Sequence, residues 1–248
     1  MISLQASVSK GWLHKYGNFV FSEKYYLDPV YRHFLDKEIN DFVRTKFLHY
    51  PVYHMEANLM QAAFVEENQI LVGGIQPNLI LAIASGAEFI SYPDKDADVN
   101  GIPLKNISKA GDLPSTEKIL NHPYIIALDS QITQIQNNHS EWKIIPPFFW
   151  DSSGRATIHG ILTTSLKLIG EKSMLMIMVD PELLHVIHQW ITEVYIALIN
   201  HFAHSTDFSI TSVHVGECSG TMISNEQYKE FITPYVSQFG KRFGNTCV

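Results

Sequence analysis

Apolar residues recur at helical spacing along two long stretches of the chain. One stretch begins at Pro181 and runs to about His201, and its apolar face comprises Leu184, Ile187, His188, Ile191, Val194, Tyr195 and Leu198. The other follows Asp28 and Pro29, which are typical of a helix cap and a first-turn proline. Because residues three and four apart share one face of a helix, both stretches are predicted to be helices.

Short apolar runs that end in glycine or polar residues predict strands between the helices. These runs are residues 51–56, 69–74, 88–92 and 143–150. A helix is predicted over residues 77–86, where Gly86 would close it, and another over residues 156–169. Strands that alternate with helices of moderate length are typical of a parallel sheet, so the pattern indicates an α/β fold.

The remaining segments are predicted to be connections. Residues 93–112 combine aspartates with glycines and are expected to form a loop, and the polar stretch 129–143 is expected to be an exposed connection. A capped helix is expected to begin within residues 112–116. No internal repeat, low-complexity tract or linker divides the chain, so residues 1–248 are interpreted as a single domain.

The net charge and the distribution of charged residues indicate which classes of binding partner are expected. The formal net charge is -7, and no cluster of lysine and arginine could neutralise a phosphate backbone, so nucleic acid is not an expected ligand. The most apolar run, residues 174–179, is far shorter than the roughly 20 residues of a membrane-spanning helix. With no secretory signal pattern and only two cysteines, the sequence favours a cytoplasmic protein without membrane association.

Three reactive side chains follow the β-branched run at residues 209–213. They are the imidazole of His214, the carboxylate of Glu217 and the thiol of Cys218. A helix is expected directly after them, so they would lie where a strand ends and a helix begins. Catalytic and ligand-binding groups collect at such places in α/β proteins.

Each of these groups has a chemical and a structural interpretation. His214 and Cys218 are candidate zinc ligands, because zinc binds imidazole and thiolate groups well, and zinc is the candidate cofactor. The alternative is that Cys218 is a core cysteine and His214 a hydrogen-bonded histidine. They would share a face only if the backbone stays extended through Gly216. Glu217 is a candidate catalytic acid or base, and His214 could act with it; a carboxylate stabilised at a helix N-terminus is the alternative.

Two further groups of polar residues are candidates. Asp151 and Arg155 flank a glycine turn, where Asp151 could orient a base and Arg155 could bind a carboxylate, although a cap and a salt bridge explain them equally well. His54, Glu56 and Asn58 end the first predicted strand. They could bind substrate at the same end of the predicted sheet as His214 and Glu217, or they could be ordinary loop residues.

Three motifs together resemble the uroporphyrinogen decarboxylase superfamily. They are a helix that ends in a Gly-Glu turn at residues 170–171, an Asp-Pro-Glu-x-x-His helix start at residues 180–185, and a helix that carries Ser224, Tyr228, Phe231, Pro234 and Tyr235. The resemblance covers about residues 70–248. It implies a TIM-type (β/α)₈ barrel with its chemistry at the carboxyl ends of the strands, and it adds Tyr228 to the substrate-binding candidates.

This superfamily contains two broad activities. One is decarboxylation of uroporphyrinogen, a tetrapyrrole, and the other is zinc-dependent methyl transfer from corrinoid proteins to a thiol or a related acceptor. The arginine-bearing N-terminal motif of true decarboxylases is absent, since residues 16–22 hold no arginine. The resemblance therefore implies an enzyme that acts on a tetrapyrrole or in corrinoid-linked methyl transfer, with a tetrapyrrole or a corrinoid protein as partner. A shortened, non-catalytic member that serves as a binding or regulatory partner is the alternative.

Members of the superfamily usually continue past the point that corresponds to Val248, into a strand that ends in a His-x-Cys-Gly-like motif and further βα units. A barrel that lacks strands has open edges, which are unfavourable unless a partner covers them. We therefore expect an incomplete barrel that a homodimer or a complementing chain completes.

Overall fold

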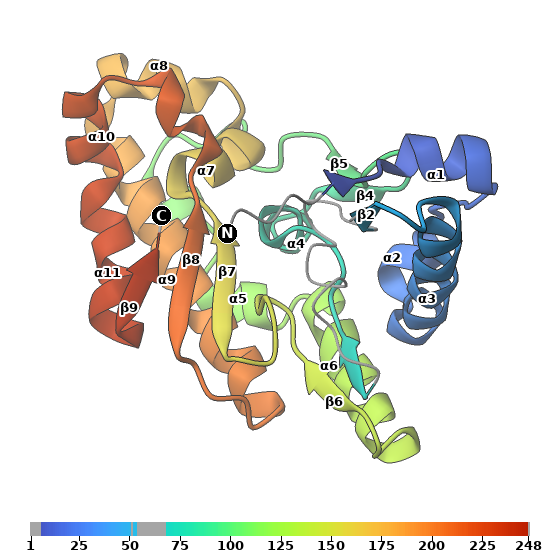
Figure 1. Ribbon diagram of the computed structural model, residues 1–248. Helices are drawn as coiled ribbons and strands as arrows, with labels where there is room; N and C mark the ends of the chain where they lie inside the picture. Colours follow the sequence, from blue (N-terminus) through green and yellow to red (C-terminus); the bar gives the residue numbers. More distant parts are fainter. Residues whose placement is uncertain (1–5, 51, 54–67, 248) are drawn as a thin grey trace.

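The computed structural model describes residues 6–50, 52–53 and 68–247 (Figure 1). Its strands are β1 (Ala6–Ser7), β2 (Val52–Tyr53), β3 (Gln69–Leu71), β4 (Glu88–Ile90), β5 (Asp98–Asn100), β6 (Lys143–Ile145), β7 (Arg155–His159), β8 (Ser212–Gly216) and β9 (Asn245–Cys247). The helices are α1 (Lys10–Gly17), α2 (Glu23–Leu27), α3 (Pro29–Lys46), α4 (Pro77–Ala84), α5 (Thr116–Leu120), α6 (Pro123–Asn138), α7 (Ile161–Ile169), α8 (Lys172–Val179), α9 (Pro181–Ser205), α10 (Asn225–Phe231) and α11 (Thr233–Phe243). Two short 3₁₀ helices, η2 (Ala110–Asp112) and η3 (Cys218–Met222), complete the elements.

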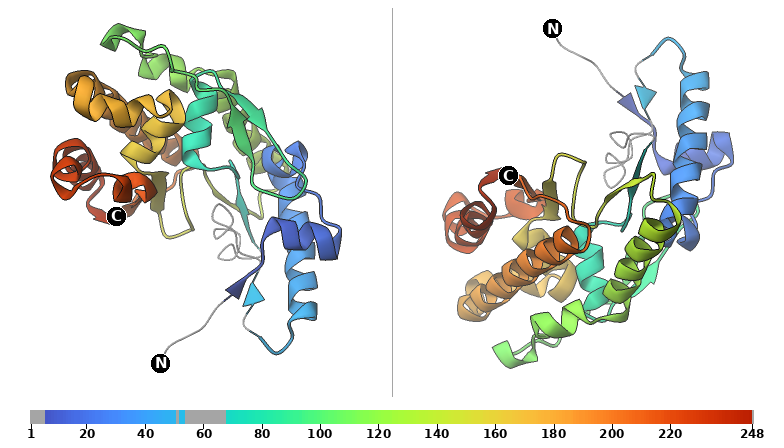
Figure 2. Two further views of the ribbon diagram at one scale, coloured as in Figure 1. Left: turned by 90° about the horizontal axis from the view of Figure 1, so that it is seen from above. Right: turned by 90° about the horizontal axis from the view of Figure 1, so that it is seen from below.

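The strands form an open arrangement with helices outside it. The described strands make four separate sheets, which are β1–β2, β3–β6, β4–β5 and β7–β8–β9. All pairs except β4–β5 are parallel. Views from above and below show the helices as an arc around the strands (Figure 2). The α/β fold is thus confirmed, but the described strands do not close into an eight-stranded barrel.

Backbone hydrogen bonds connect the segment after β6 to β7. The Thr157 N–H donates to the Phe148 carbonyl at 2.7 Å, and the Trp150 N–H donates to the Arg155 carbonyl at 2.8 Å. Phe149 forms an isolated antiparallel bridge to Ala156. The β3–β6 pair is therefore joined to the three-stranded sheet by a turn and not by continuous strand pairing.

Burial alternates along β8, because successive side chains of a strand point to opposite faces, whereas in β7 the polar Thr157 is buried together with its apolar neighbours. Ala156, Ile158, Val213 and Val215 are each at most 2% exposed. They form the apolar side of the sheet, and α4 and α11 contact these strands. The long helix α9 packs behind α7 and α11, so the sheet has one face in the core and one face toward the open side.

Several predicted helices and caps are confirmed. Helix α9 begins at Pro181 as expected and ends four residues after His201, at Ser205. The Asp28 side chain caps α3 by accepting the Tyr31 N–H, and Ser224 forms a capping box with Gln227 at the start of α10.

Three predictions of secondary structure are wrong. Residues 156–169 are not one helix, because residues up to His159 belong to β7 and the helix starts only at Ile161. The strand at residues 88–92 does not join a parallel sheet, since β4 forms an antiparallel hairpin with β5, which lies inside the predicted loop 93–112. Most of the stretch 129–143 belongs to helix α6, whose polar residues cover its exposed side.

The last described residues return to the sheet. The expected single helix from Ser224 to Tyr235 is two helices, because α10 ends at Phe231 and Pro234 lies in the first turn of the next helix, α11. The chain then forms β9, which pairs in parallel with β8 of the same chain, Asn245 with Ser212 and Cys247 with His214. No helix within the described ranges is long and apolar enough to cross a membrane.

Candidate functional site

The open face of β7 and β8 carries polar side chains at alternate positions. In the parallel register Arg155 lies beside Ser212, Thr157 beside His214, and His159 beside Gly216. The intervening residues are the buried apolar ones, so this face is the one turned away from the helices. His159 ends β7 and Glu217 follows β8, and the carboxyl ends of the strands are where barrel enzymes carry their catalytic residues.

Glu217 follows the end of β8 and binds the start of a different helix. Its carboxylate accepts hydrogen bonds from the Leu162 N–H at 3.0 Å, from the Thr163 N–H at 3.1 Å and from the Thr163 hydroxyl at 2.8 Å. These backbone donors lie in the first turn of α7, which has no side-chain cap of its own. A helix N-terminus has free N–H groups and partial positive charge, so Glu217 supplies the cap from the neighbouring strand.

Gly160 makes this approach of strand and helix possible. It occupies the N-cap position of α7, and a Cβ atom there would overlap the Glu217 carboxylate and lie 2.6 Å from the Glu217 Cα. Real Cβ atoms do not come so close to a backbone atom. Gly160 is therefore required because β8 ends directly against the start of α7.

Two opposing effects act on the Glu217 carboxyl. Burial disfavours the charged form and raises its pKa, while hydrogen bonds from Thr163, Leu162 and Ile161 oppose this shift, and burial is the larger effect. Glu217 in turn contributes to the raised pKa of Tyr228, although burial contributes more. Tyr228 also lies against Gly220, so the structure brings two of the candidate residues, Glu217 and Tyr228, into one cluster.

Two imidazoles lie on the open face of the sheet. Burial is the main cause that lowers the pKa of His159 to about 4, and Lys167 and His214 lower it further. Burial and Arg155 lower the pKa of His214 as well. Both rings are thus neutral near pH 7. The His159 Nδ1 atom is buried and has no hydrogen-bond partner among the described residues, and the same burial opposes its protonation.

Asp151 and Arg155 lie at the opposite end of the strands. They form a salt bridge at 3.1 Å, and the guanidinium lies over the Trp150 ring, 5.3 Å from its centroid. Arg155 begins β7 and His159 ends it, so the salt bridge lies about 13 Å along the strand from the Glu217 end. Trp150 also makes an edge contact with the His214 ring, with centroids 6.0 Å apart. The structure therefore connects Arg155 with His214 but not with Glu217.

The described side chains do not form a zinc site. Within the described part of the chain, no group of three His, Cys, Asp or Glu side chains could hold a metal ion. Cys218 opens η3 and is exposed, while His214 lies inside β8. Among the described side chains, His214 and Cys218 therefore lack a third donor for zinc. The expected substrate-binding residues His54, Glu56 and Asn58 lie outside the described residues.

Sequence reasoning did not select His159, Thr163 or Trp150 as site residues. His159 and Thr163 fall in the stretch that was expected to be one continuous helix, and reading residues 155–159 as a strand would have placed His159 on the face of His214. Thr163 binds Glu217 across 54 residues of chain, a contact that no local pattern indicates.

Of the comparisons with known proteins, the one with solved structures bears on the fold. No family model matches the chain, and no curated protein matches its sequence. Among solved structures, a methyltransferase from Methanosarcina mazei shares the fold with a TM-score of 0.52 over 77% of this chain, at 15% sequence identity. The match covers 54% of that structure, so this chain spans about half its length. An identity this low shows a common fold and no more.

Proposed function

We propose that this protein takes part in methyl transfer to a small nucleophile, and that the open face of β7 and β8 is its site. The observation that carries the proposal is the placement of two imidazoles, His159 and His214, on one strand face of a fold shared with a methyltransferase. Burial lowers the pKa of both rings, which favours their neutral form. The resemblance of the motifs at residues 170–185 and 224–235 supports the same class of reaction.

The proton chemistry of such a transfer suits His214. When a thiol accepts a methyl group, sulfur forms a bond to carbon, the donor keeps the electron pair of the broken bond, and the thiol proton must leave. A neutral imidazole can take that proton, which is the role of a general base. His214 is half-buried beside the Trp150 ring, so the proton would move to a group held in a partly dry site.

Glu217 has a positioning role in this proposal. Both carboxylate oxygens are occupied by donors from α7, so the carboxylate holds the end of β8, and with it His214, against the helix. We derive no step through zinc, because the described donors do not assemble a metal site. Decarboxylation of a tetrapyrrole has no support, since a substrate with many carboxylates needs several cations and Arg155 on this face is already paired with Asp151.

An anaerobic assay with methylcobalamin as donor and a panel of small thiols tests the proposal. The expected result is thiol-dependent loss of methylcobalamin absorbance above the rate without protein. His214→Ala should slow the reaction by about 100-fold, the lower range for loss of a general base. Cys218→Ser, at an exposed position outside the face, is the matched control and should react normally. Absence of transfer with every thiol, or an unchanged rate in His214→Ala, would contradict the proposal.

A further inference from the structure

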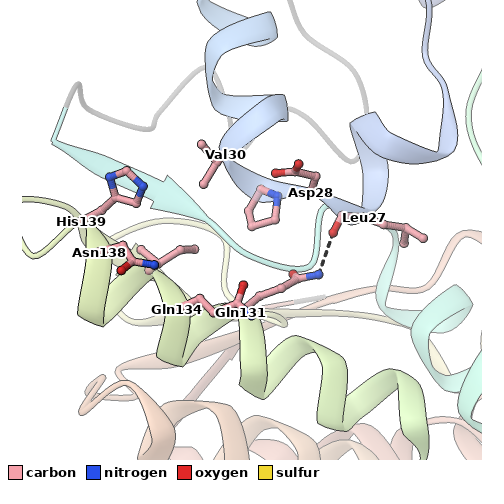
Figure 3. Close-up of a pocket in the computed structure, with 9 residues that line it drawn as sticks. Leu27, Asp28, Val30, Gln131, Gln134, Asn138 and His139 are labelled. Carbon is pink, nitrogen blue, oxygen red and sulfur yellow. Dashed lines mark hydrogen bonds between the residues drawn. The ribbon is translucent and has the colours of Figure 1, made fainter.

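A groove with a volume of about 350 Å³ separates the junction of α2 and α3 from α6 (Figure 3). One wall is the start of α3 around Asp28, and the other is the face of α6 that carries Gln131, Gln134 and Asn138. These helices lie away from β7 and β8 in Figure 1. The groove is therefore independent of the site proposed for methyl transfer.

The polar groups of the groove are mainly side-chain amides. The Gln131 amide nitrogen donates to the Leu27 carbonyl at 2.6 Å, which fixes this side chain across the groove and leaves its oxygen as an acceptor (Figure 3). Gln134 and Asn138 are exposed at the mouth of the groove, and each amide is both donor and acceptor. Asp28 uses Oδ1 to cap α3 and has a second oxygen. Alternating donors and acceptors of this kind match hydroxyl groups, which also donate and accept.

The charge of the lining excludes anionic ligands. No lysine or arginine lines the groove, and Asp28 contributes a carboxylate. A phosphate or carboxylate group would meet this negative charge without a lysine or arginine to pair with, and the imidazole of His139, the one other basic group among the described lining residues, lies 3.4 Å from the Glu141 carboxylate. The volume falls near the lower end of the range for small-molecule sites, which is about 300–1,000 Å³. Both observations favour a small, neutral ligand.

An aromatic stack outside the groove holds His139, which lies at its end. His139, the last lining residue, stacks on Trp142 with ring centroids 4.4 Å apart and planes inclined by 15°. His33 packs against the same indole at 5.0 Å. Val30 and the buried Ile135 add apolar surface to the lining. A saturated ring with hydroxyl substituents could place its C–H groups on this apolar surface and its hydroxyl groups against the side-chain amides.

We propose that this groove binds a neutral, hydroxyl-rich ligand of about monosaccharide size. The test is saturation-transfer NMR on the full chain, with D-glucose, D-galactose and myo-inositol as ligands and glucose 6-phosphate as the charged comparison. At least one neutral compound should bind in the millimolar range. Because one hydrogen bond contributes about 1 kcal/mol, Gln134→Ala and Asn138→Ala should each weaken binding about fivefold.

Asn137→Ala is the matched control, because Asn137 is exposed on α6 but does not line the groove. This variant should bind like the wild type, and circular dichroism should show that all three variants keep the helix content. The proposal is overturned if none of the three neutral compounds binds at tens of millimolar. It is equally overturned if the two amide variants bind as well as Asn137→Ala, or if glucose 6-phosphate binds more tightly than glucose.

Discussion

Removal of the Glu217 carboxylate tests how strongly β8 is attached to α7. In Glu217→Ala the N–H groups of Leu162 and Thr163 and the Thr163 hydroxyl lose their shared acceptor. Loss of a helix cap costs about 1 kcal/mol, and buried donors left without a partner add about 1–3 kcal/mol. Burial of the charge, which raises the Glu217 pKa, offsets part of this. We therefore predict a loss of about 2–3 kcal/mol in the free energy of unfolding.

Glu217→Gln should be less damaging and should change the pH dependence. The folded-state pKa of Glu217 is raised, so this group stabilises the fold fully below the unfolded pKa, and that stabilisation is lost as pH rises through the folded pKa. At pH 7 the glutamine variant avoids the buried charge but keeps one acceptor oxygen. Its free energy of unfolding should be about 1 kcal/mol lower than that of the wild type. In the wild type the Glu217 carboxyl makes this free energy fall as the pH rises above 4.5, and the glutamine variant should not show that fall.

Urea unfolding followed by tryptophan fluorescence measures both variants. Glu226→Ala is the matched control, because Glu226 is an exposed acid in the first turn of α10. An exposed carboxylate at a helix N-terminus contributes about 0.3–1 kcal/mol. If Glu217→Ala is no less stable than Glu226→Ala, the carboxylate does not hold the strand to the helix, and the reasoning is refuted.

The remaining predictions concern the same fold. Gly160→Ala should lower the melting temperature by several degrees, because its Cβ meets the backbone of the β8 end, and a wild-type melting temperature would contradict this. The lowered pKa values of His159 and His188, each about 4, make their stabilisation complete above pH 6.5 and lost as pH falls through 4. The buried His188 alone should contribute on the order of 3 kcal/mol, and a flat unfolding free energy from pH 6.5 to 4 would exclude it. Metal analysis should give the same zinc content for the purified wild type and for Cys218→Ser. A lower zinc content in the variant would restore the zinc hypothesis. Because β9 is paired on one side only among the described strands, we expect a dimer or a complex in light scattering, and a stable monomer would oppose that.

The helices were predictable where their signals are local. Helix α9 has a proline start and apolar residues at regular spacing, and the Asp28 and Ser224 caps are read from single residues with known preferences. These signals depend on neighbours within one turn. The prediction of these helices and caps therefore does not depend on how distant parts of the chain fold.

The boundary between β7 and α7 was not predictable in the same way. Apolar residues recur through both halves of the stretch 156–169, and the strand passes into the helix at Gly160 with no proline or polar run between them. A buried strand and a buried helix have similar composition when both faces are covered. Helix α6 was missed for the opposite reason, because its polar residues outnumber Ile125, Leu128, Ile132 and Ile135, which face the core at helical spacing.

The candidate site was only partly predictable. His214 and Glu217 could be placed after a strand by the β-branched run that precedes them. The partners of Glu217 lie 54 and 55 residues earlier in the chain, and only the parallel pairing of β7 with β8 brings them together. For the same reason Asp151 and Arg155 could not be assigned to the amino end of β7 from their sequence alone.

The rate of thiol-dependent demethylation of methylcobalamin, compared between His214→Ala and Cys218→Ser, tests the central claim most directly. Our account predicts a slow His214→Ala variant and a Cys218→Ser variant that reacts like the wild type, since His214 lies on the open face of β8 and Cys218 does not. Equal rates in the two variants, or no reaction in the wild type, would contradict it.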